Sequence, residues 1–340
     1  MAARGGPANG GRRARLSRHA ALPAGRVSTG APADRLGRAG RRAVADHGGG
    51  GPLVSAVLEL RAVDHVYPDG SAGLRDCSLT LGRGRRHALL GANGAGKTTV
   101  LQHLNGLLRP TAGQLRLDGQ AFDYGRAGLV ELRRRVGLVF QNPERQLFSA
   151  QVEEDVSFGP LNLGLDDATV RERVAAALDA VGLRGHARRA VHHLSFGQKK
   201  RVCIAGVLAM EPEVLLLDEP MAGLDAPMQA ELAALLDRLA ARGVTVLLST
   251  HDVDFAFRWA DDIHVMAAGR CIASGPAAQL ATQTEALRAA GQHPPLALTL
   301  HAELVKRGVL PPGPAPRSTD LLLEALRALP VLEYPGEINV

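Results

Sequence analysis

The chain has 340 residues, 46% of them hydrophobic, which is enough apolar material for a sizeable buried core. No stretch reaches the roughly 18 consecutive apolar residues that a spanning helix needs, so the sequence predicts a chain that does not cross a membrane by itself. The three cysteines, Cys77, Cys203 and Cys271, lie far apart without CxxC spacing. This pattern argues against a zinc site or a disulfide framework and fits a reducing cytoplasm.

The excess positive charge, formally +6, is concentrated at the N-terminus. Residues 1–52 are rich in Arg, Gly, Ala and Pro and contain hardly any large apolar side chain, so we expect a disordered basic extension. No apolar segment follows the arginines, as a secretory signal would require, and a nucleic-acid arm is the alternative to a solvated tail. A further hypothesis places the native start at Val54 or Val57; peptides from residues 1–50 in a mass spectrum would reject it.

Short apolar runs recur along the rest of the chain, mostly alternating with helical patterns. Residues 57–60 predict a first strand, and residues 87–90 predict a strand that enters a glycine-rich turn and then a helix. Four further strand-like runs cover residues 136–140, 214–217, 244–248 and 263–266. This alternation is typical of an α/β sheet, and we assign the chain to the α/β class.

Two regions lack strand-like runs. Between about residues 141 and 194, apolar residues recur at helical spacing, which predicts a helical insertion; they are Val170, Val174, Ala177, Leu178 and Val181. After about residue 280, helix-like pieces at 302–306 and 321–326 are separated by the proline-rich segment 310–316. We therefore expect a small C-terminal helical appendage.

The glycine-rich turn carries the strongest motif of the sequence. Residues 91–99, GANGAGKTT, match GxxxxGK[ST] between a predicted strand and a predicted helix. Glycines let consecutive backbone N–H groups face a phosphate, and the positive end of the helix dipole adds attraction. Lys97 would contact the β- and γ-phosphates, and the Thr98 hydroxyl would complete the shell of a Mg²⁺ ion. The predicted nucleotide contacts here are Gly91, Asn93, Gly94, Ala95, Gly96, Lys97, Thr98 and Thr99.

A pair of acids follows one of the apolar strands. The run at 214–217 ends in Asp218 and Glu219, which places both carboxylates at the carboxyl edge of the sheet, where ligands of such folds bind. We expect Asp218 to bind Mg²⁺ and Glu219 to orient or deprotonate the attacking water. The alternative is a strand-end turn with solvated acids. The presence of the phosphate loop in the same sequence makes this alternative the less favoured one.

A second anion site is predicted at Ser195. The segment 194–198, LSFGQ, lies just ahead of a helical apolar stretch, so Ser195 and the amides that follow it stand at a helix N-terminus. Taken alone, this pentapeptide is equally well explained as a simple helix cap.

Together these motifs form an ordered series, which continues with Gln141, the segment 222–225 (AGLD) and His251. The series resembles the ATPases of ABC transporters over about residues 57–280. The resemblance implies a P-loop NTPase core with an antiparallel β subdomain and a helical subdomain. The corresponding domain would cover residues 53–285, with its helical subdomain at about 141–205, and the appendage would cover 286–340.

The resemblance also implies roles for individual residues. Tyr67 would stack on adenine, Gln141 would link Mg²⁺ and the attacking water to a membrane partner, and His251 would sense the γ-phosphate. Asp225 would lie at the dimer seam, and Ser195, Gly197 and Gln198 would contact the ATP of the opposite subunit. The implied catalytic set is Lys97, Gln141, Glu219 and His251, and the implied Mg²⁺ set is Thr98, Gln141 and Asp218. Taken singly, His251 and Tyr67 are also explained as packing residues.

Two positions depart from the usual pattern of the family. Met221 stands where most members have Thr, and Phe196 stands where many have Gly or another small residue. We expect neither departure to abolish ATP hydrolysis.

Finer resemblance indicates one branch of the family. Residues 140–148 (FQNPERQLF) and 152–165 look like energy-coupling-factor ATPases, and 104–111 and 249–254 look most like the ATPase of cobalt importers. This implies ATP and Mg²⁺ as cofactors, cobalt or nickel ions as cargo, and a place on the cytoplasmic face of the cell membrane. The implied partners are an integral-membrane coupling subunit, a substrate-binding membrane subunit and a second, identical ATPase subunit, with no nucleic acid.

Two alternatives stay open at the level of sequence. One is the ATPase of a vitamin or other small-solute importer, which shares the chemistry and differs in its partners. The other is a soluble ABC ATPase that acts on ribosomes or nucleic acid. Against the second stand the single ATPase half and the lack of a long coiled-coil interruption in this sequence.

Overall fold

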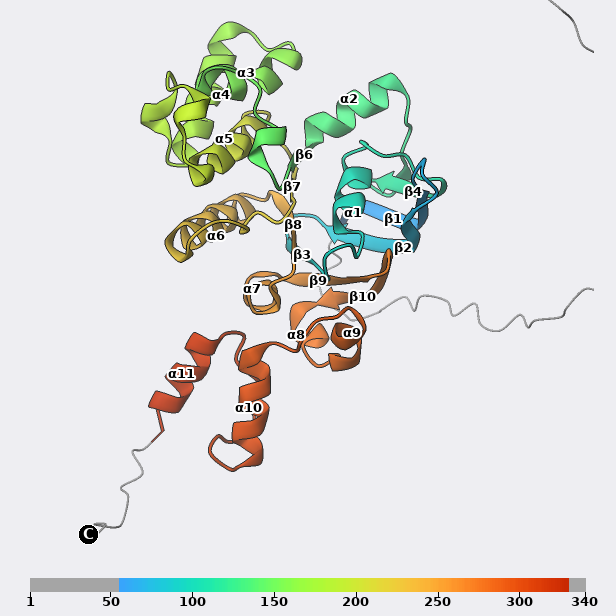
Figure 1. Ribbon diagram of the computed structural model, residues 1–340, viewed down its shortest axis with the longest axis vertical. Helices are drawn as coiled ribbons and strands as arrows, with labels where there is room; N and C mark the ends of the chain where they lie inside the picture. The colour runs from blue at the N-terminus through green and yellow to red at the C-terminus, as the bar shows by residue number, and fades with distance from the viewer. Residues whose placement is uncertain (1–54, 330–340) are drawn as a thin grey trace, which may run out of the picture. The chain divides into compact units, whose positions relative to one another are not determined.

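The computed structural model describes residues 55–329, which form two β-sheets with helices around them (Figure 1). The predicted basic extension, residues 1–52, and the last part of the predicted appendage, from residue 330, lie outside the described residues. Within residues 55–329, every helix is too short or too polar to span a bilayer.

The larger sheet is mainly parallel. Its strands are β10 (Arg270–Pro276), β9 (Asp262–Ala267), β3 (Arg86–Leu90), β8 (Thr245–Thr250), β7 (Val214–Leu217) and β6 (Val136–Val139), in that spatial order. Only β10 among them pairs with its neighbour in the antiparallel sense. Successive residues of the central strands enter different cores, as Leu89 does relative to Leu90, because side chains alternate across a strand. A parallel sheet covered on both faces therefore reads as a continuous apolar run.

One face of this sheet is covered by a smaller antiparallel sheet. That sheet is formed by β2 (Ala72–Gly82), β1 (Ala56–Val66), β4 (Ala112–Leu117) and β5 (Gln120–Ala121). The helix α1 (Lys97–Leu104) contributes Val100, Leu101 and Leu104 to the same core, and α2 (Arg126–Arg135) contributes Leu132. The phosphate-loop helix is thus fixed by apolar packing between the two sheets.

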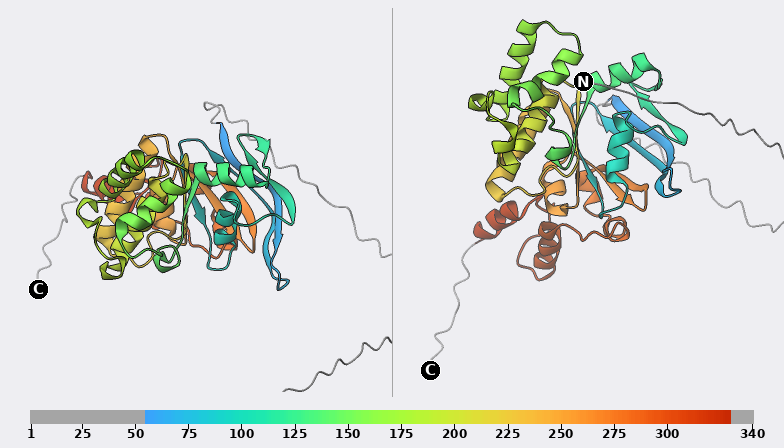
Figure 2. Two further views of the ribbon diagram at one scale, coloured as in Figure 1. Left: turned by 90° about the horizontal axis from the view of Figure 1, so that it is seen from above. Right: turned by 45° about the horizontal axis from the view of Figure 1, so that its top comes forward.

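Helices cover the other face (Figure 2). Between β6 and β7 the chain forms α3 (Val152–Asn162), α4 (Asp167–Ala180) and α5 (Phe196–Leu208), with single 3-10 turns at 143–145, 184–186 and 191–193. After β7 follow α6 (Ala226–Ala241) and α7 (Val253–Trp259). Asp166 accepts hydrogen bonds from the N–H groups of Ala168 and Thr169 and so caps α4, which fixes the start of that helix.

The C-terminal part consists of α8 (Ala277–Leu280), α9 (Thr284–Ala289), α10 (Leu296–Lys306) and α11 (Thr319–Arg327). Two contacts join it to α7. The Leu296 N–H donates to Asp254 at 2.8 Å, and the Arg317 guanidinium donates to the carbonyl of Ala260 at 2.7 Å.

The fold-class prediction is confirmed. Each strand predicted from an apolar run lies in one of the two sheets, and the segments predicted as helical around 170–181, 302–306 and 321–326 lie in α4, α10 and α11. The antiparallel sheet, which only the family resemblance implied, is present as well.

Candidate functional site

The site is assembled from the carboxyl ends of parallel strands. The loop after β3 runs through residues 91–96 into α1, and β6, β7 and β8 end beside it in Gln141, Asp218 and His251. Gly96 is the N-cap of α1 with φ of 101°, a left-handed conformation that glycine adopts without strain. A side chain at Gly91 would collide with the carbonyl of Met266 at 2.6 Å. The glycines therefore permit a tight loop of the kind whose backbone N–H groups can face a phosphate.

Lys97 is buried at the first position of α1, with 6% of its surface exposed. Its ammonium donates to the carbonyls of Gly91 at 2.7 Å and Ala92 at 3.2 Å. It also lies 3.1 Å from Glu219 Oε1, without the alignment of a hydrogen bond. A buried cation held by the loop carbonyls can form a charge-assisted hydrogen bond with an anionic ligand at the loop.

Asp218 connects the acid pair to the phosphate loop. Its Oδ2 accepts a hydrogen bond from the Thr98 hydroxyl at 2.7 Å, and its Oδ1 accepts one from the Ser249 hydroxyl at 2.6 Å. The same Ser249 oxygen accepts from the N–H of Glu219 at 2.9 Å. Ser249 thus orients both acids, a role that sequence analysis missed because the contact joins residues from different strands.

Glu219 has an unusual backbone and a confined carboxylate. Its φ is 44°, in the left-handed region, which costs roughly 1 kcal/mol or more for a residue other than glycine and is concentrated at functional sites. Its Oε2 lies 3.1 Å from Nδ1 of His251, whose ring is exposed at the surface. Its Oε1 is buried and lies 3.1 Å from the Lys97 ammonium. When Lys97 turns to an anionic ligand, this carboxylate oxygen is suited to accept a proton or a hydrogen bond from a bound molecule.

A cavity of about 470 Å³ joins these groups. It is lined by ten of the predicted site residues: Tyr67, Asn93, Gly94, Gly96, Lys97, Thr98, Thr99, Gln141, Asp218 and Glu219. Tyr67 lies in the wall, where its hydroxyl is 2.9 Å from the Thr99 hydroxyl and its ring forms a T-shaped contact with His65, with 4.7 Å between centroids. Two predicted loop contacts lie outside the lining: Gly91, whose carbonyl holds Lys97, and Ala95, which is buried.

The remaining predicted residues lie outside this lining: His251, which contacts Glu219 at the end of β8, and four residues at the starts of two other helices. Ser195 caps α5, and its capping box with Gln198 is reciprocal, with N···O distances of 3.3 and 3.0 Å. Gly197 is in the first turn of α5, against Met228. Asp225 caps α6 by accepting from the N–H of Met228 at 2.9 Å. Their predicted contact with the ATP of an opposite subunit stays a prediction.

Two further residues near the site were not predicted as site residues. Lys200, on α5, reaches the carbonyls of the turn that follows Glu219. Gln292, between α9 and α10, has its amide oriented by its neighbours, so that it donates to the carbonyl of His251 and accepts from the N–H of Ala92, both at 3.1 Å. Both contacts depend on chain segments remote in sequence, so no local pattern could indicate them.

Comparison with known proteins identifies strong similarities. The family model described as "ABC transporter" matches residues 74–222, which include the phosphate loop and the acid pair. The chain is 45% identical to the energy-coupling factor transporter ATP-binding protein EcfA of Methanothermobacter thermautotrophicus, over 78% of this chain and 79% of that protein. It is 46% identical to the cobalt import ATP-binding protein CbiO of Rhodobacter capsulatus, over 79% of this chain and 96% of that protein.

Among solved structures, the fold is similar to cbiO1 from Clostridium perfringens, described as part of the ABC transporter complex cbiONQ. The TM-score is 0.63 at 40% identity, and the match covers 74% of this chain and 99% of that chain.

Proposed function

The chain belongs to the ATP-binding proteins of ABC transporters, and from this membership we propose that it powers an energy-coupling-factor importer that takes up cobalt or nickel ions. The observation that carries the ATPase part is the meeting of Lys97, Asp218 and Glu219 in one cavity at the sheet edge. The choice of branch is supported by the names of the similar proteins, EcfA and CbiO, and by the cbiONQ complex to which the similar structure belongs.

The triphosphate of ATP would lie on the phosphate loop. The N–H groups of residues 93–99 and the positive end of α1 attract its negative charge, and Lys97 exchanges its contacts with Gly91 and Ala92 for the β- and γ-phosphates. Tyr67, on the cavity wall, would stack on the base.

The donor set at Thr98 and Asp218 fits a Mg²⁺ ion. Hard hydroxyl and carboxylate oxygens are the ligands that Mg²⁺ prefers, and it usually takes one or two from the protein and the rest from phosphates and water. Thr98, Asp218 and Gln141 would hold the ion, and when bound it would neutralise charge that develops on the phosphates.

Hydrolysis needs a water molecule in line with the γ-phosphate and a group that accepts its proton. Glu219 would take that role through the buried oxygen Oε1, and His251, which touches the other oxygen, would contact the γ-phosphate. Gln141, exposed at the end of β6, would link this water to the membrane partner.

A second ATPase subunit would complete the site. Ser195, Gly197, Gln198 and Asp225 lie outside the cavity of their own chain, so we propose that they contact ATP across a homodimer. Two such subunits would close on two ATP molecules and reopen after hydrolysis, and this movement would be transmitted to the membrane subunits.

The proposed partners are an integral-membrane coupling subunit and a substrate-binding membrane subunit, which would hold the ATPase at the cytoplasmic face of the membrane. The alternative cargo is a vitamin or another small solute. Action on ribosomes or nucleic acid is the less favoured alternative, because the similar proteins EcfA and CbiO and the similar structure cbiO1 are named as parts of transporters.

Purification of the chain from membranes with its partners tests the proposal. We expect recovery with integral-membrane subunits, and, in vesicles that contain the complex, ATP-dependent uptake of Co²⁺ or Ni²⁺ that is lost in Glu219→Gln. Uptake of a vitamin instead of either ion would contradict the cargo. Recovery with ribosomes would contradict the transport function itself.

A further inference from the structure

Lys200 is a buried cation that none of the proposed steps uses. It is 3% exposed and lies on α5, in the second turn after Ser195. Its ammonium donates to the carbonyls of Glu219, Pro220 and Ala222 at 3.3, 2.7 and 2.6 Å. An ammonium has three N–H donors, so these three carbonyls use its full capacity. Across residues 55–329, no carboxylate lies within ion-pair distance of it.

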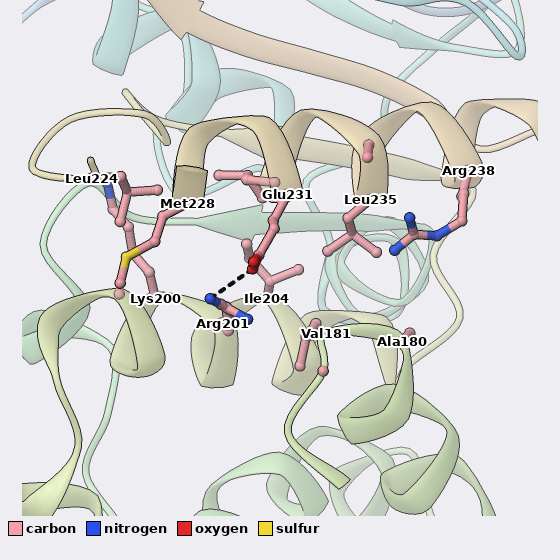
Figure 3. Close-up of a pocket in the computed structure, with 14 residues that line it drawn as sticks. Ala180, Val181, Lys200, Arg201, Ile204, Leu224, Met228, Glu231, Leu235 and Arg238 are labelled. Atoms are coloured by element: carbon pink, nitrogen blue, oxygen red, sulfur yellow. Dashed lines mark ion pairs between the residues drawn. The ribbon is translucent and has the colours of Figure 1, made fainter. Parts of the chain in front are cut away.

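The surroundings of Lys200 offer no alternative partners. Its side chain lies at one end of a cavity of about 220 Å³ between α5 and α6, beside Leu224 and Met228 (Figure 3). The lining of this cavity is mainly apolar, and the ring of Phe196 lies 5.4 Å from the ammonium. A charge in such surroundings is strongly held by the few dipoles that it meets.

These dipoles belong to the turn that carries Glu219. The left-handed backbone of Glu219 needs support from its neighbours, since this conformation is unfavourable for a residue with a side chain. Its N–H is held by Ser249, and its carbonyl is held by the N–H of Ala222 at 3.2 Å and by Lys200. Lys200 is the only one of these groups that connects the turn to α5.

We propose that Lys200 is a positioning residue for ATP hydrolysis, which fixes the turn 219–222 to α5 and so holds the Glu219 carboxylate in line with the attacking water. The inference rests on the proposed ATPase function and adds a mechanical link to it. The helix whose first turn is proposed to contact the ATP of the opposite subunit is tied, through one side chain, to the catalytic turn of its own chain.

The test replaces Lys200 by methionine, which keeps the length and apolar stem of the side chain and removes its three donors. We expect kcat for ATP hydrolysis to fall on the order of 10²-fold, since small displacements of a catalytic group have effects of this size. ATP affinity should stay within about threefold, because the phosphate loop is intact. Lys199→Met is the matched control: Lys199 precedes Lys200 on the helix, pairs with Glu144 instead of the turn, and should leave kcat unchanged.

A second arm separates positioning from a general structural role. In the Glu219→Gln background, the effect of Lys200→Met on the residual single-turnover rate should disappear, because both changes act through the same carboxylate. If Lys200→Met does not fold, as judged by circular dichroism, Lys200→Leu takes its place, since it also removes the three donors.

The possible outcomes are distinct. Full hydrolysis by a folded Lys200 variant, or a loss that is undiminished in the Glu219→Gln background, would overturn the positioning role while leaving the proposed ATPase intact. A parent protein that neither binds nor hydrolyses ATP with Mg²⁺ and its partner subunits would overturn the proposed function, and this inference with it.

Discussion

The two predicted groups of nucleotide contacts are built in different ways. At the sheet edge, Lys97 and Asp218 are buried, and Asp218 is hydrogen-bonded to residues of two other segments. At the starts of α5 and α6, Ser195 and Asp225 are exposed, and their side chains bond only within their own helix turns. The first group is fixed by the fold, whereas the second is also fully explained as helix caps. Experiments must therefore separate a ligand contact from a cap in the second group only.

Glu219→Gln should have the largest effect within the buried group. The amide cannot accept a proton, so we expect the hydrolysis rate to fall by about 10²–10⁴-fold while ATP binding persists. Turnover and equilibrium binding of ATP by the purified protein measure both. Glu211→Gln is the control, since Glu211 shares a left-handed backbone, with φ of 52°, and pairs with Arg173 outside the cavity lining. Near-normal turnover of Glu219→Gln would remove the catalytic role.

Lys97→Ala should weaken the binding of ATP, because the buried lysine is proposed to contact the phosphates directly. A hydrogen bond to a charged group contributes about 1.5–3 kcal/mol, so ATP affinity should weaken by roughly ten- to hundredfold. Titration with a fluorescent ATP analogue measures this change. Unaltered affinity, with Lys199→Ala as the reference, would mean that Lys97 is only a structural partner of the loop carbonyls.

Ser195→Ala tests whether an exposed residue at the start of α5 contacts ATP or only caps its helix. Ser318 caps α11 in the same way, by accepting from the N–H of Leu321 at 3.2 Å, so Ser318→Ala is a matched change of residue and role. Each loses a cap worth about 1 kcal/mol of local helix stability. We expect only Ser195→Ala to reduce ATP-dependent dimerisation, measured by light scattering in the Glu219→Gln background. If the two variants dimerise equally with ATP, Ser195 acts only as a helix cap.

The smallest expected effect is a pH dependence that arises at Lys200. Burial lowers the pKa of its ammonium to about 8, and the carboxylate of Glu219 partly offsets this. Below that pH all three donors are present, and above it the neutral amine turns a lone pair toward the carbonyl oxygens. The rate of hydrolysis should therefore decline as the pH rises through about 8.

Other groups near Lys200 do not produce this decline. The Cys203 thiol stays neutral because burial raises its pKa to about 12, and Glu231 is paired with Arg201. A pH–rate profile of Lys200→Arg, which keeps its charge, should lack the decline. A decline of equal size in that variant would assign the pH dependence to another group.

The sequence predicted the parts of the fold that depend on local pattern. The strands at 87–90 and 214–217 are buried on both faces, so they read as short apolar runs, and the motifs attached to them locate the cavity. The edge strand β10 was missed because it contains Gly275 and Pro276 and only partly buries alternate residues. Such a strand is defined by its pairing with β9, which is a tertiary property.

In the site, too, contacts that depend on tertiary structure could not be predicted from local sequence. Residues within a motif, such as Thr98 and Asp218, were predicted and lie together at 2.7 Å. No role was predicted for Ser249 or Gln292, because their roles depend on backbone and side-chain contacts between segments far apart in the chain. Lys200 lies just after the predicted segment 194–198, but only the folded chain reveals that its ammonium holds the turn after Glu219.

The position of β3 inside the larger sheet also determines when this part of the chain can fold during synthesis. His87 pairs with Leu247 on one side and with Asp262 on the other, so the strand that precedes the phosphate loop meets its neighbours only after those later segments exist. During synthesis on a ribosome, the phosphate loop therefore cannot be held by the folded sheet until most of the polypeptide has been made. Truncated nascent chains that end before β8 should be unable to retain nucleotide, however complete their glycine motif.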